Sequence, residues 1–178
     1  RDFLASGAMK GVGRKTAAAI VERFGENTLQ VIEEDPGQLC GISGIGPKTA
    51  AKISEAFKQH REFANITLYL QNYGINSHYA MKLYEVYGAD TIQAIEENPY
   101  QLVDDIFGIG FKKADKIAEK MGIAHDDRFR IQSGIKFTLT YFAGEGNTFL
   151  PQEELCEKTG QMLDLPMQQI EDNIAEMA

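Results

Sequence analysis

A short glycine-containing pattern that occurs four times is the strongest constraint on how this chain folds. Three copies read glycine, apolar residue, glycine and then, within two residues, a lysine or arginine; the remaining copy keeps only its first glycine. The copies are residues 10–17, 43–50, 73–80 and 107–114, called here the first, second, third and fourth turns. Closely spaced glycines break a helix but suit a sharp reversal of the chain. Each copy therefore predicts a tight turn that opens a helix.

The residues after each turn have the spacing of an amphipathic helix. Apolar side chains recur at intervals of three and four residues, which places them on one helix face. The stripes are Ala17, Ile20, Val21 and Phe24; Ala50, Ile53 and Phe57; Ala80, Leu83, Tyr84 and Tyr87; and Ala114, Ile117, Ala118 and Met121. No segment alternates convincingly with the period of two that a half-buried strand would show. The predicted fold class is all-α.

A longer repeat contains the turns in pairs. Residues 24–36 are echoed by residues 87–99 at an offset of 63 residues, and each copy ends in a proline that stops a short helix. Such self-similarity indicates that a unit of two hairpins was duplicated. We therefore expect two packed all-helical units, residues 1–62 and 63–124. A break near His60 is expected in the helical stretch that joins them.

Residues 125–178 differ from the duplicated part. Apolar spacing predicts helices over 128–143, 151–163 and 166–177, with a short extended piece at 148–150. This order of helix, short strand, helix and helix matches the front of a winged-helix-like domain. The segment is therefore expected to form a third, small helical part.

Charge is distributed unevenly along the chain. The net charge of the 178 residues is −8, which argues against a generic electrostatic DNA-binding protein. Residues 1–124 nevertheless carry only −2, whereas residues 125–178 carry −6. Basic residues lie beside the turns, and the acidic excess lies mostly in the last third. We expect that last third to pack on protein rather than on DNA.

The composition also indicates in which cellular compartment the protein is expected. No apolar run approaches the roughly 18 residues of a membrane span, and the start at Arg1 does not resemble a signal peptide. Cys40 and Cys156 are the only cysteines, too few and too far apart for a zinc site or a disulfide scaffold. The expectation is a fragment of a longer protein of the cytoplasm, with both cysteines buried as apolar residues.

The turns have the chemistry of phosphate binding. Positive φ is cheap only for glycine, and a residue without a Cβ lets a phosphate approach the backbone. The first N–H groups of the following helix are unsatisfied and partly positive, so that a phosphate oxygen fits there. The middle residues Val12, Ile45 and Ile109 are expected to point inward. At the third turn Asn76 replaces the second glycine; since asparagine tolerates positive φ, the fold can survive there, and we expect this turn to be mainly structural.

Other candidate groups are weaker. His60, His78 and His125 are isolated from carboxylates or cysteines at ligand spacing, which argues against metal or catalytic roles. Tyr69, Tyr73 and Tyr79 suit core packing better than base stacking. The sequence contains no Gly-x-x-x-x-Gly-Lys-Ser/Thr motif, so these residues do not predict ATP hydrolysis by that route.

At this point the motifs resemble a known family. The first, second and fourth turns look like the helix-hairpin-helix motif of proteins that bind DNA without sequence specificity. Residues 96–102, leading into 105–115, resemble the N-terminal region of RecD-like DNA helicases, the long bacterial type often labelled exodeoxyribonuclease V alpha subunit. Residues 145–151 and the following 153–155 resemble that family's next segment. The resemblance covers essentially the whole chain.

The resemblance implies a duplicated pair of helix-hairpin-helix units in a parent enzyme that unwinds DNA 5′ to 3′ with ATP and Mg²⁺. That enzyme would act in DNA repair or recombination in the bacterial cytoplasm. Its motor domains would follow this fragment in the chain and contact it, while the fragment itself would hold no cofactor, metal or catalytic residue. The implied DNA-backbone contacts are Gly11, Gly13, Arg14 and Lys15; Gly44, Gly46, Lys48 and Thr49; and Gly108, Gly110, Lys112 and Lys113.

Two alternatives remain open. In one, the hairpins are a scaffold that docks on the motor or a partner protein without gripping DNA, which the net negative charge favours. In the other, the first turn is the hairpin of a base-excision DNA glycosylase, with Lys15 as nucleophile and Glu33 or Asp35 as its acidic partner. The repetition of the motif and the lack of a cysteine cluster for an iron–sulfur centre argue against the glycosylase.

Overall fold

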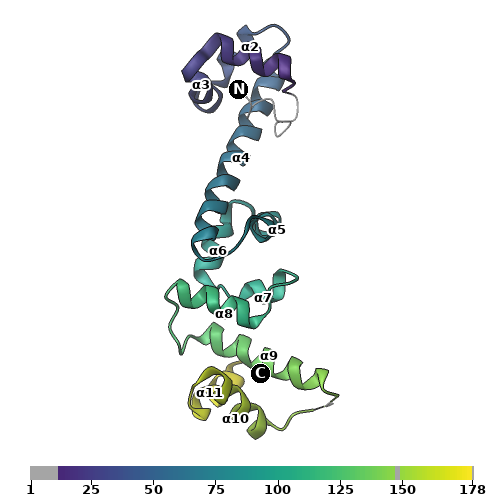
Figure 1. Cartoon of the computed structure of the whole chain (residues 1–178), viewed down its shortest axis with the longest axis vertical. Helices are drawn as coiled ribbons and strands as arrows, with labels where there is room; N and C mark the ends of the chain where they lie inside the picture. The colour runs from purple at the N-terminus through teal and green to yellow at the C-terminus, as the bar shows by residue number, and fades with distance from the viewer. Residues whose placement is uncertain (1–11, 147–148, 178) are drawn as a thin grey trace. The chain divides into compact units, whose positions relative to one another are not determined.

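The computed structural model describes residues 12–146 and 149–177, and in this part of the chain all regular secondary structure is helical (Figure 1). The predicted all-α class is confirmed. No helix within these residues combines the length and hydropathy of a membrane span. The chain divides into two compact units, Arg1–Asn65 and Ile66–Ala178.

The first unit contains the first two turns. Its elements are α2 (Arg14–Phe24), η1 (Gly25–Asn27), α3 (Thr28–Glu34), η2 (Pro36–Gly41) and the first part of α4 (Pro47–Asn72). Pro47 opens α4 because the first helical position has no N–H bond to lose. The predicted stripes form its core, in which Ala17, Ile20, Ala50, Ile53 and Phe57 are buried.

The second unit contains the other two turns and the C-terminal helices. After the end of α4 it comprises α5 (Ser77–Tyr87), η3 (Gly88–Asp90), α6 (Thr91–Glu97), α7 (Gln101–Asp105), α8 (Phe111–Lys120), α9 (Arg128–Gly144), α10 (Gln152–Leu163) and α11 (Met167–Met177). One core cluster runs from Ile66 to Ile170 and includes the stripes of α5 and α8. Helices α9, α10 and α11 pack on one another, and α9 also contacts α8 (Figure 1).

The duplication is visible in the backbone. Gly25 ends α2 with φ 53° and ψ −125°, and Gly88 ends α5 with φ 57° and ψ −131°. The first residue of the following α-helix then hydrogen-bonds to this glycine in both copies. Thr28 Oγ1 of α3 donates to the Gly25 carbonyl at 2.7 Å, and Thr91 Oγ1 of α6 donates to the Gly88 carbonyl at 2.6 Å. The offset of 63 residues therefore relates equivalent positions of one repeated structure.

Three expectations were wrong. The break near His60 is absent, because α4 continues as one helix through this position. Phe149 and Leu150 belong to no strand in the described part of the chain, and Thr148 lies outside it. Cys40 is exposed, whereas Cys156 is buried as expected. The division into 1–62, 63–124 and 125–178, with a winged-helix-like last part, stays a prediction.

Candidate nucleic-acid interface

The first glycine of each described turn is required by the backbone. Gly44, Gly74 and Gly108 have φ values of 89°, 82° and 96°, in the region that disfavours every residue with a Cβ. The next residue points inward as predicted, since Val12, Ile45, Ile75 and Ile109 are all at most 5% exposed. Gly11 lies outside the described residues. The second, third and fourth turns thus each combine a left-handed glycine with an apolar anchor in the core.

The second position has a different geometry from the one expected. Gly13 precedes α2 with φ −78° and ψ 167°, Asn76 precedes α5 with φ −77° and ψ 168°, and Gly110 precedes α8 with φ −91° and ψ 171°. This is extended backbone that any residue adopts. The expectation that Asn76 survives by tolerating positive φ was therefore wrong; positive φ belongs to Gly74, and Asn76 serves as the N-cap of α5.

The N-cap decides what happens to the first N–H groups of the helix. Asn76 Oδ1 accepts from the Tyr79 N–H at 3.1 Å, so the third turn satisfies one of these donors itself. Within the described chain, neither α2 nor α8 receives such a side-chain cap, because Gly13 and Gly110 have no side chain. Among residues 12–146 and 149–177, a Cβ built on Gly13, Gly46 or Gly110 would meet no heavy atom within 4 Å. These three glycines therefore face open space.

The cations predicted to contact DNA are mostly displayed at the surface. Arg14, Lys15, Lys48 and Lys112 are exposed, and none of them joins an ion pair among residues 12–146 and 149–177. Thr49 and Lys113 are half-buried. Lys113 is turned toward the third turn, where its Nζ lies 3.7 Å from the centroid of the Tyr79 ring. Four of the predicted basic contacts are thus available to an anion.

The structure brings the third and fourth turns together through α5. Tyr79 Oη donates to the Gly108 carbonyl at 3.1 Å, and Lys82 Nζ donates to the Phe107 carbonyl at 3.3 Å. The fourth turn is thereby held from α5, and it presents Phe107, whose side chain is 94% exposed. In the first unit, the anchors Val12 and Ile45 share one core cluster. Sequence reasoning missed the roles of Tyr79 and Lys82, because only the packed structure shows which carbonyls they reach.

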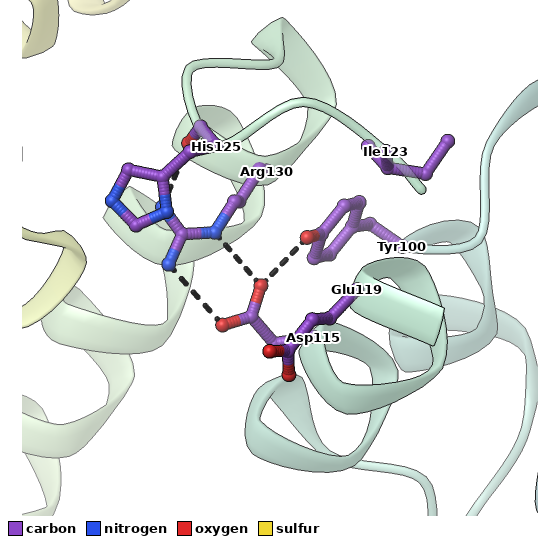
Figure 2. A pocket seen from close by; sticks show the side chains of 6 residues that line it. All are labelled: Tyr100, Asp115, Glu119, Ile123, His125 and Arg130. Carbon is purple, nitrogen blue, oxygen red and sulfur yellow. Dashed lines mark hydrogen bonds and ion pairs between the residues drawn. The ribbon is translucent and has the colours of Figure 1, made fainter. Parts of the chain in front are cut away.

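A second candidate is a polar pocket of about 310 Å³ in the second unit (Figure 2). Figure 2 shows the Asp115 carboxylate between Tyr100 and Arg130: Tyr100 Oη donates to Oδ1 at 2.6 Å, and Arg130 Nε donates to the same oxygen at 2.9 Å. Arg130 Nη1 also donates to the carbonyls of His125 and Leu163, at 2.8 and 3.1 Å. Because these groups satisfy one another, the pocket is a junction that ties α8 and α9 to the end of α10.

The Tyr100 hydroxyl is adapted to this junction. Burial, followed by the hydrogen bond to Asp115, raises the pKa of Tyr100 well above its ordinary value of 10.0. The neutral hydroxyl is therefore the donor over the whole physiological range. Sequence reasoning missed this network, since Tyr100 and Arg130 are 30 residues apart and follow no motif.

The residues required by the glycosylase alternative are engaged elsewhere. Glu33 pairs with Arg61, and Asp35 Oδ2 accepts from Gln38 Nε2 at 2.9 Å. In the described chain neither carboxylate pairs with Lys15, which is exposed on α2. Among the described residues, Lys15 is therefore not assembled with either of these carboxylates.

Comparison with known proteins agrees with this geometry. A family model for the helix-hairpin-helix domain of the ATP-dependent RecD2 DNA helicase matches residues 59–149, just over half of the chain, and one for a SAM-like helix-hairpin-helix tandem matches residues 3–59. The chain is 29% identical over 143 residues to the ATP-dependent RecD2 DNA helicase of Deinococcus radiodurans. That match covers 80% of this chain but 20% of the relative, so the chain spans about a fifth of its length. The chain belongs to the family of helix-hairpin-helix domains of ATP-dependent RecD2 DNA helicases.

Proposed function

We propose that this chain is a DNA-binding accessory module that grips the sugar-phosphate backbone without reading sequence. The observation that carries the proposal is the uncapped N-terminus of α2 and of α8, each preceded by a glycine that the fold does not require. Gly46 occupies the same position before α4 and also faces open space. Each of these three helix starts is suited to a phosphate group.

The presence of glycine at these N-cap positions supports the proposal that a phosphate binds there. The extended backbone at Gly13 and Gly110 is open to any residue, and asparagine or serine makes at least as good an N-cap. The third turn shows this alternative, since Asn76 has nearly the same φ and ψ as Gly13. Folding alone does not explain why the other turns lack a capping side chain. A phosphate oxygen that must reach the N–H groups does explain it.

Local charge favours the same conclusion in spite of the net charge of −8. Lys15, Lys48 and Lys112 each lie within the first turn of a helix and are exposed, so that their ammonium groups add to the positive end of the helix dipole. Contacts of this type fix the protein on the backbone and carry no sequence information. With only a few phosphates neutralised, binding should be weak and its salt dependence shallow.

The test is a fluorescence-anisotropy titration of the chain against single-stranded, duplex and forked DNA at several salt concentrations. The Gly46→Asn/Gly110→Asn variant gives two turns the residue that the third turn already has. It should keep or slightly raise the thermal stability, because an asparagine N-cap is better than glycine by a few tenths of a kcal/mol. Its affinity for DNA should fall by about fivefold or more, because the new side chains occupy the N–H groups.

A charge series completes the test. Lys48→Ala/Lys112→Ala should weaken binding and lower the slope of log affinity against log salt by about two. Lys58→Ala removes one charge from an exposed position of α4 outside the turns, and it should have a much smaller effect than Lys48→Ala alone. If all variants bind DNA like the wild type, or the wild type binds no DNA at low salt, the chain is instead a scaffold that docks on a protein, as its net charge would allow.

The family supplies the wider proposal. The relative of Deinococcus radiodurans is named an ATP-dependent RecD2 DNA helicase, and the chain spans about a fifth of it. We therefore place the module in an ATP- and Mg²⁺-dependent 5′–3′ helicase that acts in DNA repair or recombination in the bacterial cytoplasm. In that enzyme the turns would face DNA, and the chain would contact the motor domains through acidic side chains of residues 125–178.

A further inference from the structure

A groove of about 480 Å³ lies in the second unit between α8, α9 and α10. It begins at the fourth turn, because Lys112 of α8 forms part of its wall. The charged and apolar residues that line the groove are Lys112, Phe137, Tyr141, Phe142, Lys158 and Met162. None of these residues except Lys112 takes part in the turns.

Aromatic rings form a row from Phe111, which is buried in the core, to the residues that line the groove. The Phe111 and Phe137 rings stack with centroids 5.4 Å apart, and Tyr141 follows Phe137 at 6.5 Å, one helical turn later on α9. Tyr141 and Phe142 then meet edge to face at 5.4 Å. The row ends in solvent, since Tyr141 is 55% exposed. An exposed ring beside an apolar groove provides a face on which another planar group can stack.

The charge of the groove is opposite to that of the chain. Its lining contains two lysines and no carboxylate, although residues 125–178 carry a net charge of −6. Lys158 Nζ lies 4.6 Å from the centroid of the Phe142 ring and 3.4 Å from Glu154 Oε1. The pair with Glu154 joins two half-buried side chains one turn apart on α10, at 3.4 Å, and a partly exposed helical pair of this kind holds the lysine only weakly. The groove thus offers cations and aromatic rings together.

We infer that this groove binds single-stranded DNA that continues from the fourth turn. Bases stack on Tyr141 and Phe142, while Lys112 and Lys158 neutralise phosphates. A single strand suits the groove better than a duplex, because only unpaired bases have faces that a protein ring can reach. Every nucleotide of a single strand also carries a phosphate and a base, which match the lysines and the aromatic rings of the groove. The inference rests on the proposed function, since Lys112 serves both the turn and the groove.

The experiment compares a blunt DNA duplex with the same duplex carrying a single-stranded thymidine tail. In a third ligand the tail consists of abasic sites, which keep the phosphates and remove the bases. The wild type should prefer the thymidine tail, and Tyr141→Ala should lower the affinity for it roughly tenfold without changing the affinity for the blunt duplex. Tyr141→Phe keeps the ring and should bind like the wild type. Leu139→Ala truncates another exposed side chain of α9, outside the groove lining, and serves as the matched control.

A second readout reports the stacking itself. With 2-aminopurine in the tail, the wild type should change the fluorescence of the probe on saturation, and Tyr141→Ala should abolish that change. Equal binding of thymidine and abasic tails, or an unchanged Tyr141→Ala variant, would overturn the inference while leaving duplex binding through the turns intact. Loss of duplex binding in the wild type would instead overturn the proposed function. If Tyr141→Ala lost affinity for an acidic, apolar peptide but kept the wild-type affinity for the thymidine tail, the groove would be assigned to a protein partner and the inference would be overturned.

Discussion

Asn76 Oδ1 accepts a hydrogen bond from the Tyr79 N–H at 3.1 Å, and this contact closes the start of α5 with the protein's own side chain. At the equivalent position of α8, Gly110 has no side chain to make it. The two helix starts have similar backbone angles and differ in the cap: the Tyr79 N–H donates to the Asn76 side chain, whereas the Lys113 N–H donates to the Gly110 carbonyl at 3.0 Å and no side chain of the described residues caps α8. This difference can be changed by single substitutions.

Asn76→Gly should therefore open the third turn. The loss of the cap should cost a few tenths of a kcal/mol in stability. Affinity for duplex DNA should rise by about two- to threefold, a small gain because Ser77 and His78 stand where other turns have basic residues. Anisotropy titration and thermal denaturation measure the two effects. A fall in affinity would mean that the Asn76 side chain itself contacts DNA.

Neighbouring residues of the fourth turn should differ sharply in their effect on stability. Ile109 is 2% exposed, so Ile109→Ser should lower the free energy of unfolding by about 3 kcal/mol, through lost burial and a buried hydroxyl. Phe107 is 94% exposed, and Phe107→Ser, which copies Ser43 of the second turn, should change it by less than about 0.5 kcal/mol. Urea denaturation of both variants measures the difference. Similar losses in the two would show that the turn is packed differently.

Arg130 should be the polar residue on which the second unit depends most. Arg130→Met removes the partner of Asp115 and leaves the carbonyls of His125 and Leu163 without their donor, which should cost about 3 kcal/mol. Arg130→Lys should recover only part of this, because an ammonium group lacks the planar fork of the guanidinium. Thermal denaturation followed by circular dichroism measures both. A loss below about 1 kcal/mol for Arg130→Met would show that the junction contributes little.

Stability should fall as pH rises above 10. The pKa of Tyr100 is raised by burial and by the hydrogen bond to Asp115, so above pH 10.0 the folded chain keeps a proton that the unfolded chain loses. The unfolded state then binds fewer protons, and the free energy of unfolding decreases with pH. Tyr100→Phe should be less stable near neutrality by about 1 kcal/mol and should decline less steeply in alkali. Parallel pH profiles of the two proteins would contradict this.

The two cysteines should react at very different rates. Cys40 is exposed, whereas Cys156 is fully buried in the core, and burial raises the pKa of its thiol. Since the thiolate is the reactive form, a maleimide or disulfide reagent near pH 8 should modify Cys40 rapidly and Cys156 only after unfolding. Cys40→Ser should therefore leave almost no reactive thiol in the folded protein. Fast modification of that variant would show that α10 opens readily.

Much of this fold was predictable because its signals are local and repeated. The inward Val12, Ile45 and Ile109 and the helical stripes follow from residue type and spacing, and so does the need for a glycine with positive φ in the turn. Duplication made them stronger, since each copy supports the assignment of the other. The family resemblance, which rests on the order of these motifs, was confirmed by the two family models that match the chain.

The errors have physical reasons. Which glycine takes positive φ cannot be read from a Gly–apolar–Gly triplet, so the role of Asn76 as an N-cap was missed. Neither Pro nor Gly lies near His60, and α4 therefore has no reason to break there. The Arg130 network and the groove between α8, α9 and α10 depend on contacts between distant residues, for which one sequence contains no signal.

The coincidence of backbone angles at Gly13 and Asn76 has an evolutionary consequence. Exchange between glycine and asparagine at this site leaves the backbone conformation unchanged. A hairpin could therefore gain or lose a ligand position while the fold stays the same. Selection can thus set how many hairpins of a tandem array remain active, one codon at a time. In a duplicated chain, a copy that has lost its ligand position would be retained because its helices still form part of the core.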